Sequence, residues 1–146
     1  MTSWRDPTSP EAQADMDGLL EPTLGFAQQQ LEKHREFFPF AVVVDRTGEQ
    51  RMVAAGTGTE RPESSDVIRL LTTGLVDQRS ELRAAAVVAD VRVPELGSDA
   101  IRVTIEHAAG IGLEILVPYR IRQFRRAVEY DDMLVSEADR SIWSNG

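Results

Sequence analysis

The chain has 146 residues, a formal net charge of -8 and no cysteine. This length suits one domain that folds without staples, and the missing thiols exclude disulfides, zinc–thiolate sites and cysteine nucleophiles. The negative charge opposes binding to a phosphate backbone, and no apolar run approaches the roughly 18 residues that a membrane helix requires. We therefore expect a cytoplasmic protein that binds neither nucleic acid nor a membrane.

The first part of the chain divides into a tail and a helix. Residues 1–17 hold prolines, acids and few large apolar side chains, so we expect a flexible tail ahead of a single α+β domain at 18–146. From Pro22 onward, apolar residues recur at steps of three and four as far as Phe38. That spacing predicts an amphipathic helix with one buried face.

A hairpin and a second helix are predicted next. Residues 40–45 form a nearly continuous apolar run and 50–55 follow a turn that contains Gly48, which is typical of two paired strands. The continuous apolar character of the first strand indicates that it is covered on both faces or flanked by neighbours. Serines and an acid at 63–66 then begin a helix with apolar residues at helical spacing over 67–75.

The second half of the chain is dominated by strands. Residues 84–93 alternate between two faces, and apolar residues alternate with polar ones over 101–105. After a turn that contains Gly110 the same period returns at 111–117. The pattern predicts a hairpin over 99–122 with one buried side and one side facing solvent.

The predicted order is therefore α-β-β-α-β-β-β. It gives a two-layer α+β fold with a five-stranded, mostly antiparallel sheet and both helices on one face. Residues 127–146 are expected to form a short edge strand and a docked terminus, and the sequence leaves open whether 119–146 are strand or helix.

The element order over residues 22–117 resembles roadblock/profilin-like folds and is similar to secretion-chaperone folds. More closely, residues 38–45, 98–101, 106–107 and 118–120 resemble an uncharacterised family of small acidic bacterial proteins. The resemblance is to a fold and a group, and it implies no activity, cofactor or site residue for this chain.

The residues best suited to proton transfer lie on one predicted strand. His107 is a candidate general base, with Glu106 or Asp99 as the acidic partner. Because adjacent strand residues point to opposite faces, Glu106 and His107 converge only if a bulge intervenes, so a structural role for His107 is favoured. No spacing typical of a metal site occurs, and we expect no metal and no cofactor.

An arginine and aromatic segment follows the hairpin and suggests a binding surface. Arginine binds carboxylates in bidentate fashion and is enriched, with aromatics, at protein interfaces. Mutual salt bridges on an exposed sheet face are the alternative interpretation. The candidate binding residues are Arg102, Leu116, Tyr119, Arg120, Arg122 and Phe124.

Three functions follow from these patterns. The favoured one is a non-enzymatic protein-binding or adaptor module that uses an exposed sheet face or edge strand, with a homodimer expected and either a second copy or another protein as the partner. The second is a small enzyme that uses His107. The third is an immunity-type inhibitor of a basic toxin, for which the net charge of -8 is the support.

Overall fold

The computed structural model describes residues 10–54, 63–122 and 127–143. The two helices are α1 (Pro10–His34) and α2 (Ser64–Gln78). The strands are β1 (Phe40–Asp45), β2 (Gln50–Val53), β3 (Leu82–Val93), β4 (Ser98–His107), β5 (Ile111–Arg122), β6 (Ala127–Tyr130) and β7 (Leu134–Glu137). Short 3-10 turns at Arg79–Glu81 and Pro94–Leu96 precede and follow β3.

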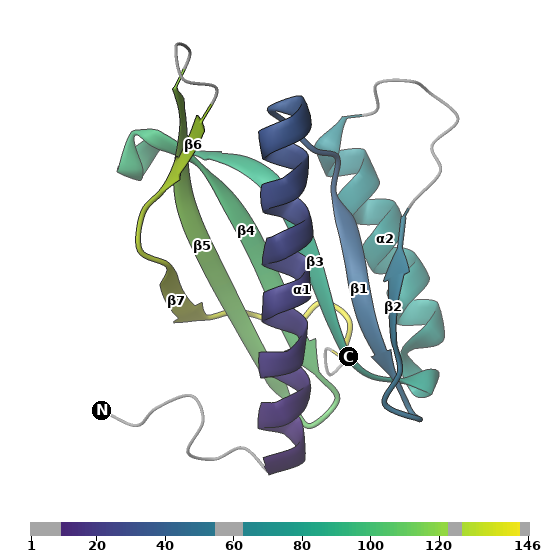
Figure 1. The fold of residues 1–146 in the computed structure, drawn as a ribbon. Coiled ribbons are helices and arrows are strands. Elements are labelled where there is room, and N and C mark those ends of the chain that lie inside the picture. Colours follow the sequence, from purple (N-terminus) through teal and green to yellow (C-terminus); the bar gives the residue numbers. More distant parts are fainter. Residues whose placement is uncertain (1–9, 55–62, 123–126, 144–146) are drawn as a thin grey trace.

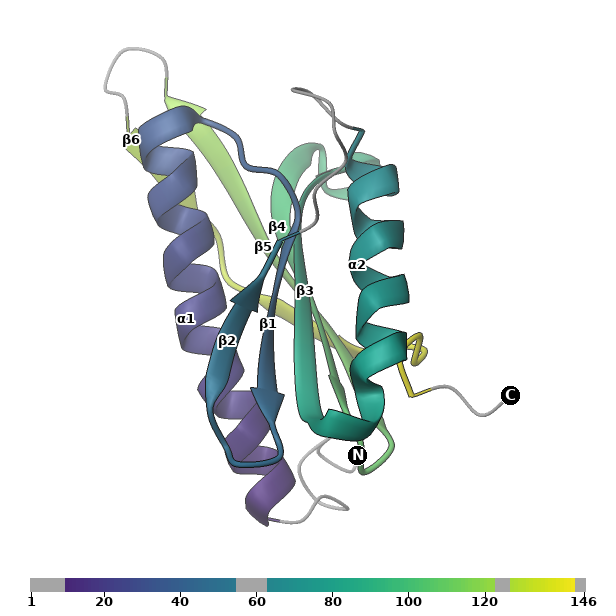
Figure 2. The same cartoon turned by 90° about the vertical axis from the view of Figure 1, so that its right-hand side faces the viewer.

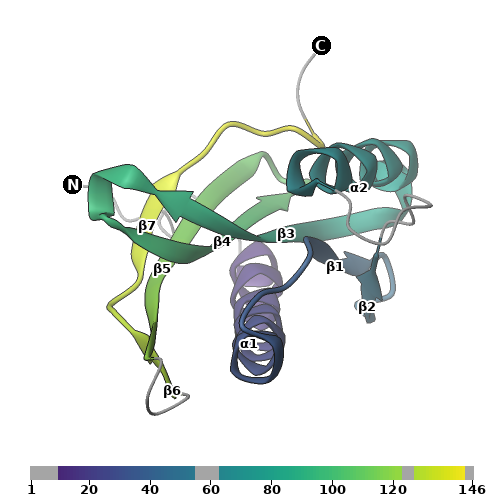
Figure 3. The same cartoon turned by 90° about the horizontal axis from the view of Figure 1, so that it is seen from above.

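All strands belong to one antiparallel sheet with the order β2-β1-β3-β4-β5-β6, and β7 also pairs with β5. The sheet curls into a half-barrel around α1 (Figure 1, Figure 3). The predicted hairpin is confirmed, with Ile105 opposite Leu113 across its turn. The expectation of five strands is wrong, because the chain after β5 adds two further segments along the free edge of β5.

The two helices lie on opposite faces of the sheet, so the expectation that both cover one face is also wrong (Figure 2, Figure 3). Val42 and Val44 of β1 join the cluster under α1, whereas Ala41 and Val43 join the cluster under α2. The apolar run in β1 is therefore buried on both sides, as its composition indicates. Hereafter the face that carries α1 is the concave face and the face that carries α2 is the convex face.

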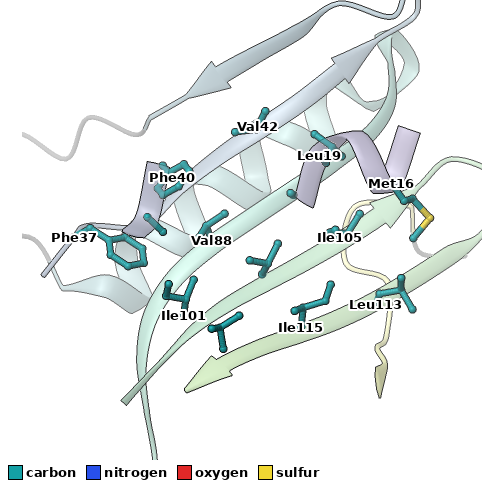
Figure 4. Close-up of a cluster of buried hydrophobic side chains, with 14 of the residues drawn as sticks. Met16, Leu19, Phe37, Phe40, Val42, Val88, Ile101, Ile105, Leu113 and Ile115 are labelled. Carbon is teal, nitrogen blue, oxygen red and sulfur yellow. The ribbon is translucent and has the colours of Figure 1, made fainter. Parts of the chain in front are cut away.

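The main core fills the concave face between α1 and strands β1 to β5 (Figure 4). From α1 it takes Met16, Leu19, Ala27 and Leu31, which recur at helical spacing, and alternate residues of each strand complete it. Several β3 positions are alanine, and small side chains allow helices to approach the sheet from both sides.

Between residues 10 and 143, leaving out the two undescribed gaps, neither helix is long and apolar enough to cross a bilayer.

Helix α1 begins at Pro10, ahead of the start at Pro22 that the periodicity indicates. Residues 10–17, assigned to the flexible tail from sequence, form its first two turns, with Asp15 and Met16 buried. Residues 1–9 of that tail lie outside the described residues. The helical pattern is weak there because a buried acid occupies a position of the apolar face.

Pro22 lies inside α1, where it cannot donate a hydrogen bond to the carbonyl of Gly18. The side chain of Gln50 in β2 supplies that bond, because its Nε2 donates to the Gly18 oxygen over 2.8 Å. A strand side chain thus satisfies the acceptor that the proline leaves open, and it joins β2 to α1.

This arrangement predicts a non-additive pair of substitutions. Gln50→Ala alone is expected to cost about 1 kcal/mol, because it leaves the Gly18 carbonyl without its donor. Pro22→Ala is expected to stabilise the chain by about 1–2 kcal/mol by restoring a backbone N–H at position 22. In that background Gln50→Ala should cost almost nothing. A double-mutant cycle measured by urea unfolding checks this, and additive effects would contradict it.

The break between β6 and β7 has its cause in Pro118. The backbone N–H of Asp131 donates to the Pro118 oxygen over 2.9 Å, so the Pro118 main chain faces the outer strand. In an antiparallel pair, a residue at position 118 would also donate its own N–H to the outer strand, and proline has no N–H to donate. The ladder therefore stops after β6 and resumes at β7, four residues beyond Tyr130.

Candidate protein-binding surface

The three residues predicted for proton transfer do not converge. Glu106 and His107 follow one another in β4 without a register shift, so their side chains lie on opposite faces of the sheet. Asp99 is at the other end of the strand, where it contacts Arg92 over 3.5 Å. The structure therefore brings none of these three side chains next to another.

His107 instead belongs to a buried polar cluster on the concave face. Its Nε2 lies 2.9 Å from Oδ2 of Asp15 in α1, and the backbone N–H of Ala109 donates to its Nδ1 over 2.9 Å. Because Nδ1 accepts, Nε2 carries the proton and donates to Asp15. Both ring nitrogens are engaged, so this geometry leaves no free lone pair for a substrate proton.

Arg83 of β3 completes the cluster. Its Nη2 and Nε donate to the two carboxylate oxygens of Asp15 over 2.5 and 3.1 Å, and Glu11 lies 3.5 Å from Nε. Burial alone raises the pKa of Asp15, but the hydrogen bonds from Arg83 and His107 outweigh it and hold that pKa below its ordinary value. The cluster joins α1 to β3 and β4 and is a structural anchor of the helix.

Glu106 has a structural partner on the convex face. Its buried carboxylate accepts the backbone N–H groups of Ile142 over 2.9 Å and Trp143 over 3.3 Å. Arg79 donates to the Ile142 oxygen over 3.1 Å, and the Ile142 side chain is buried in the cluster under α2. Residues 138–143, which we call the C-terminal arm, thus cross from β7 to the edge of α2 (Figure 3).

Tyr119, predicted as a binding residue, is buried on the concave face. Its hydroxyl donates to Asp90 of β3 over 2.5 Å. Burial raises the pKa of Asp90 above its ordinary value, and the hydrogen bond from Tyr119 only partly offsets this. Burial and the neighbouring carboxylate raise the pKa of Tyr119 as well, so its hydroxyl stays protonated as a donor.

Tyr119→Phe is expected to destabilise the chain by about 1–2 kcal/mol near neutral pH, because the Asp90 carboxylate loses its donor. When folding raises the pKa of a carboxyl, its protonated form stabilises the folded state at pH values below the ordinary pKa. This stabilisation is lost as the pH rises through the raised pKa. The substitution raises that pKa further, so its cost should shrink as the pH is lowered toward 4. Urea unfolding at both pH values checks this, and a cost independent of pH would contradict it.

The remaining predicted binding residues lie on the convex side of β4 and β5 or at their ends. Arg102 and Arg120 alternate with the buried Ile101 and Tyr119, and the pairing of β4 with β5 passes through Pro118 without a shift. Leu116 is half-buried opposite Arg102. These three side chains therefore share the convex face.

The last two predicted binding residues fall at the end of β5 or beyond it. Arg122 pairs with Glu129 of β6 over 3.1 Å, so its charge is partly used within the chain. Phe124 lies outside the described residues. Arg122 therefore adds no unpaired cation to the convex face.

A groove of about 600 Å³ lies on this face between the sheet and the start of the C-terminal arm. Arg102, Thr104 and Glu114 form one wall, and Glu137, Ala138 and Asp139 form the other. Within the described ranges, Arg102 makes no ion pair, and the three carboxylates of the groove make none either. Among the described residues, the groove therefore presents charged groups that no ion pair occupies.

The short edge strand expected within residues 127–146 contains exposed apolar residues that were not among the predicted binding residues. Met133, Leu134 and Val135 are consecutive and are 45%, 47% and 45% exposed. The other large apolar residues that are exposed in the described part of the chain are separated from one another along the sequence: Phe38, Met52, Leu70 and Leu96. Three adjacent exposed apolar residues at a sheet edge are a feature that isolated domains usually avoid. The acids around them concealed this signal in the sequence.

Comparisons with protein-family models, with curated proteins and with solved structures gave no match. The resemblance to a family of small acidic bacterial proteins therefore stays a prediction. In the part of the chain that the structure covers, no three His, Asp or Glu side chains are grouped as metal ligands. The case for function thus depends on the convex groove and the outer strand.

Proposed function

We propose that this chain is a non-enzymatic protein-binding or adaptor module. Its binding surface consists of the convex groove, the neighbouring Leu116 and Arg120, and the edge of β7. The observation that carries the proposal is the exposed triplet of Met133, Leu134 and Val135 beside unpaired charged groups. Apolar residues surrounded by polar ones are typical of protein interfaces.

The charge of residues 127–139, which form the outer edge of this surface, favours a different protein over a second copy. Residues 127–139 contain no lysine or arginine, and their acids are Glu129, Asp131, Asp132, Glu137 and Asp139. Two copies joined along this edge would place like charges against each other, which opposes association. The expected homodimer would therefore use another surface.

An immunity-type inhibitor of a basic toxin is the second candidate. The same acidic stretch supports it, because a cationic partner would be attracted to this edge. The enzyme hypothesis based on His107 gains no support, since Asp15 and Ala109 engage both ring nitrogens.

The proposal is tested with a photo-crosslinking residue placed at Arg120, which is exposed on the convex face, and at Arg69, an exposed control on α2. We expect Arg120 to yield a discrete adduct in the native cell, and Arg69 to yield none. The adduct partner, once purified, should bind the wild-type chain and lose about tenfold or more in affinity to Leu134→Asp. Equal labelling at both positions, or no affinity of the purified partner, would exclude this surface.

A further inference from the structure

We propose that the free edge of β7 accepts an additional strand from the partner, and that this strand combines lysine or arginine with apolar side chains. This inference rests on the proposed function and specifies its mode of binding. Strand addition takes its affinity from main-chain hydrogen bonds and its specificity from side chains on both faces.

The main chain of β7 has unused groups at this edge. The backbone N–H of Ala138 donates to the Gly112 oxygen over 3.0 Å, so residue 138 faces β5. Because hydrogen bonding alternates along an antiparallel strand, Ser136 and Leu134 face β5 as well, and Val135 and Glu137 face outward. No described strand lies beyond β7, and no described residue hydrogen-bonds the outward N–H and C=O groups of Val135 and Glu137.

The side chains around this edge define the chemistry of the strand that would bind. Leu134 pairs with Leu116 on the convex face, and Val135 pairs with Ile115 on the concave face. An added strand would therefore meet an exposed apolar side chain on each face. Residues 127–139 carry five acids and no basic residue. Arg122 pairs with Glu129 and Arg102 lines the adjoining groove, but the other four acids make no ion pair within the described residues, which favours a cationic strand and repels an acidic one.

The opposite edge of the sheet, formed by β2, differs from the β7 edge in its contacts with the helices and in its charge. In β2, Gln50 donates to Gly18 of α1 and Arg51 donates to Gln78 of α2 over 3.2 Å, so side chains of this strand are tied to both helices. Arg51 also places a positive charge there. The backbone N–H of Asp45 donates to the Glu49 oxygen, so residue 49 faces β1. Because hydrogen bonding alternates along an antiparallel strand, residue 51 also faces β1 and the N–H of Met52 faces outward, as that of Val135 does. Met52 is thus a matched control position.

The experiment uses the full chain and a fluorescent peptide of sequence KVRVKVRVK. Val135→Pro removes an outward N–H without removing a bond to β5, so the fold should persist while the added strand loses its donor. We expect this variant to weaken peptide binding by about tenfold or more, from the lost hydrogen bond and the clash of the ring. Met52→Pro should leave the affinity within about twofold, since it alters the other edge.

Two further peptides separate strand addition from charge attraction alone. The same peptide with alternate backbone amides methylated should not bind, because its strand cannot form the ladder. The acidic peptide EVEVEVEVE should not bind either. Circular dichroism and the amide spectrum of β5 confirm that each protein variant is folded.

Several results would overturn the inference. These are no binding of KVRVKVRVK, equal binding of its methylated form, equal binding of the acidic peptide, or unchanged affinity in a folded Val135→Pro variant. Self-association that Val135→Pro abolishes would assign the edge to a second copy and would also overturn it. If the peptide fails while the Arg120 adduct persists, the binding surface stands and only strand addition is lost. If both fail, the proposed function fails as well.

Discussion

Replacing Asp15 with alanine is expected to destabilise the chain by about 2–3 kcal/mol. Breaking a fully buried ion pair by removing one partner costs about 3–5 kcal/mol, and here water partly solvates the Arg83 side chain, which is 26% exposed. His107 also loses the acceptor of its Nε2 proton. Urea unfolding near pH 7 measures the loss directly.

The matched control for this substitution is Asp66→Ala. Asp66 also pairs with an arginine, since Nη2 of Arg69 lies 2.9 Å from its carboxylate, but both side chains are more than half exposed. Exposed pairs three residues apart in a helix contribute a few tenths of a kcal/mol. If Asp15→Ala costs no more than this control, the cluster is not an anchor of α1.

The pH dependence of the Asp15 contribution follows from the direction of its pKa shift. The folded-state pKa lies below the ordinary value of 3.8, so the stabilisation is complete above that value and is lost as pH falls through the lowered pKa. The stability difference between wild type and Asp15→Asn should therefore be constant above about pH 4 and shrink below it. A difference that grows as the pH is lowered would contradict this assignment.

Gly112→Ala is expected to displace the C-terminal arm and cost about 2–3 kcal/mol. A Cβ at this position would lie 2.5 Å from the backbone oxygen of Ala138 and 3.2 Å from Cγ of Arg140. A backbone oxygen cannot move aside like the end of a flexible side chain. The bond between Ala138 and Gly112 should break, and β7 should lose its register on β5.

Hydrogen exchange at residues 134–143, together with urea unfolding, measures this effect. Gly74→Ala is the control, since its added Cβ would meet no atom within 4 Å beyond its chain neighbours and its own helix backbone, and alanine favours the α2 helix by about 0.5–1 kcal/mol over glycine. Gly112→Ala should also abolish binding of KVRVKVRVK, because the strand that receives the peptide is displaced. Full exchange protection of the arm in this variant would show that its contact with the sheet is not tight.

The spacing of residues along the chain predicted the 99–122 hairpin but not the hydrogen-bond partner of Tyr119. The hairpin over 99–122 could be predicted because apolar and polar residues alternate along each of its strands, and the turn lies between them. The same alternation places Arg102 and Arg120 on one face. It could not show that Tyr119 donates to Asp90 on the concave face, because Asp90 belongs to β3 and β4 lies between β3 and β5.

The sequence by itself determined the two strands of the hairpin and which of their residues share a face. It also determined the burial of β1 on both sides. These features are local consequences of spacing and composition. The tertiary structure alone decided that the helices lie on opposite faces and that Asp15, 92 positions from His107, binds its ring. It also decided that Met133 and the first two residues of β7, Leu134 and Val135, are exposed at the edge of the sheet. The spacing of apolar residues indicates which side chains are buried. The residue that each side chain contacts depends on segments that are far apart in the sequence and meet only in the folded chain.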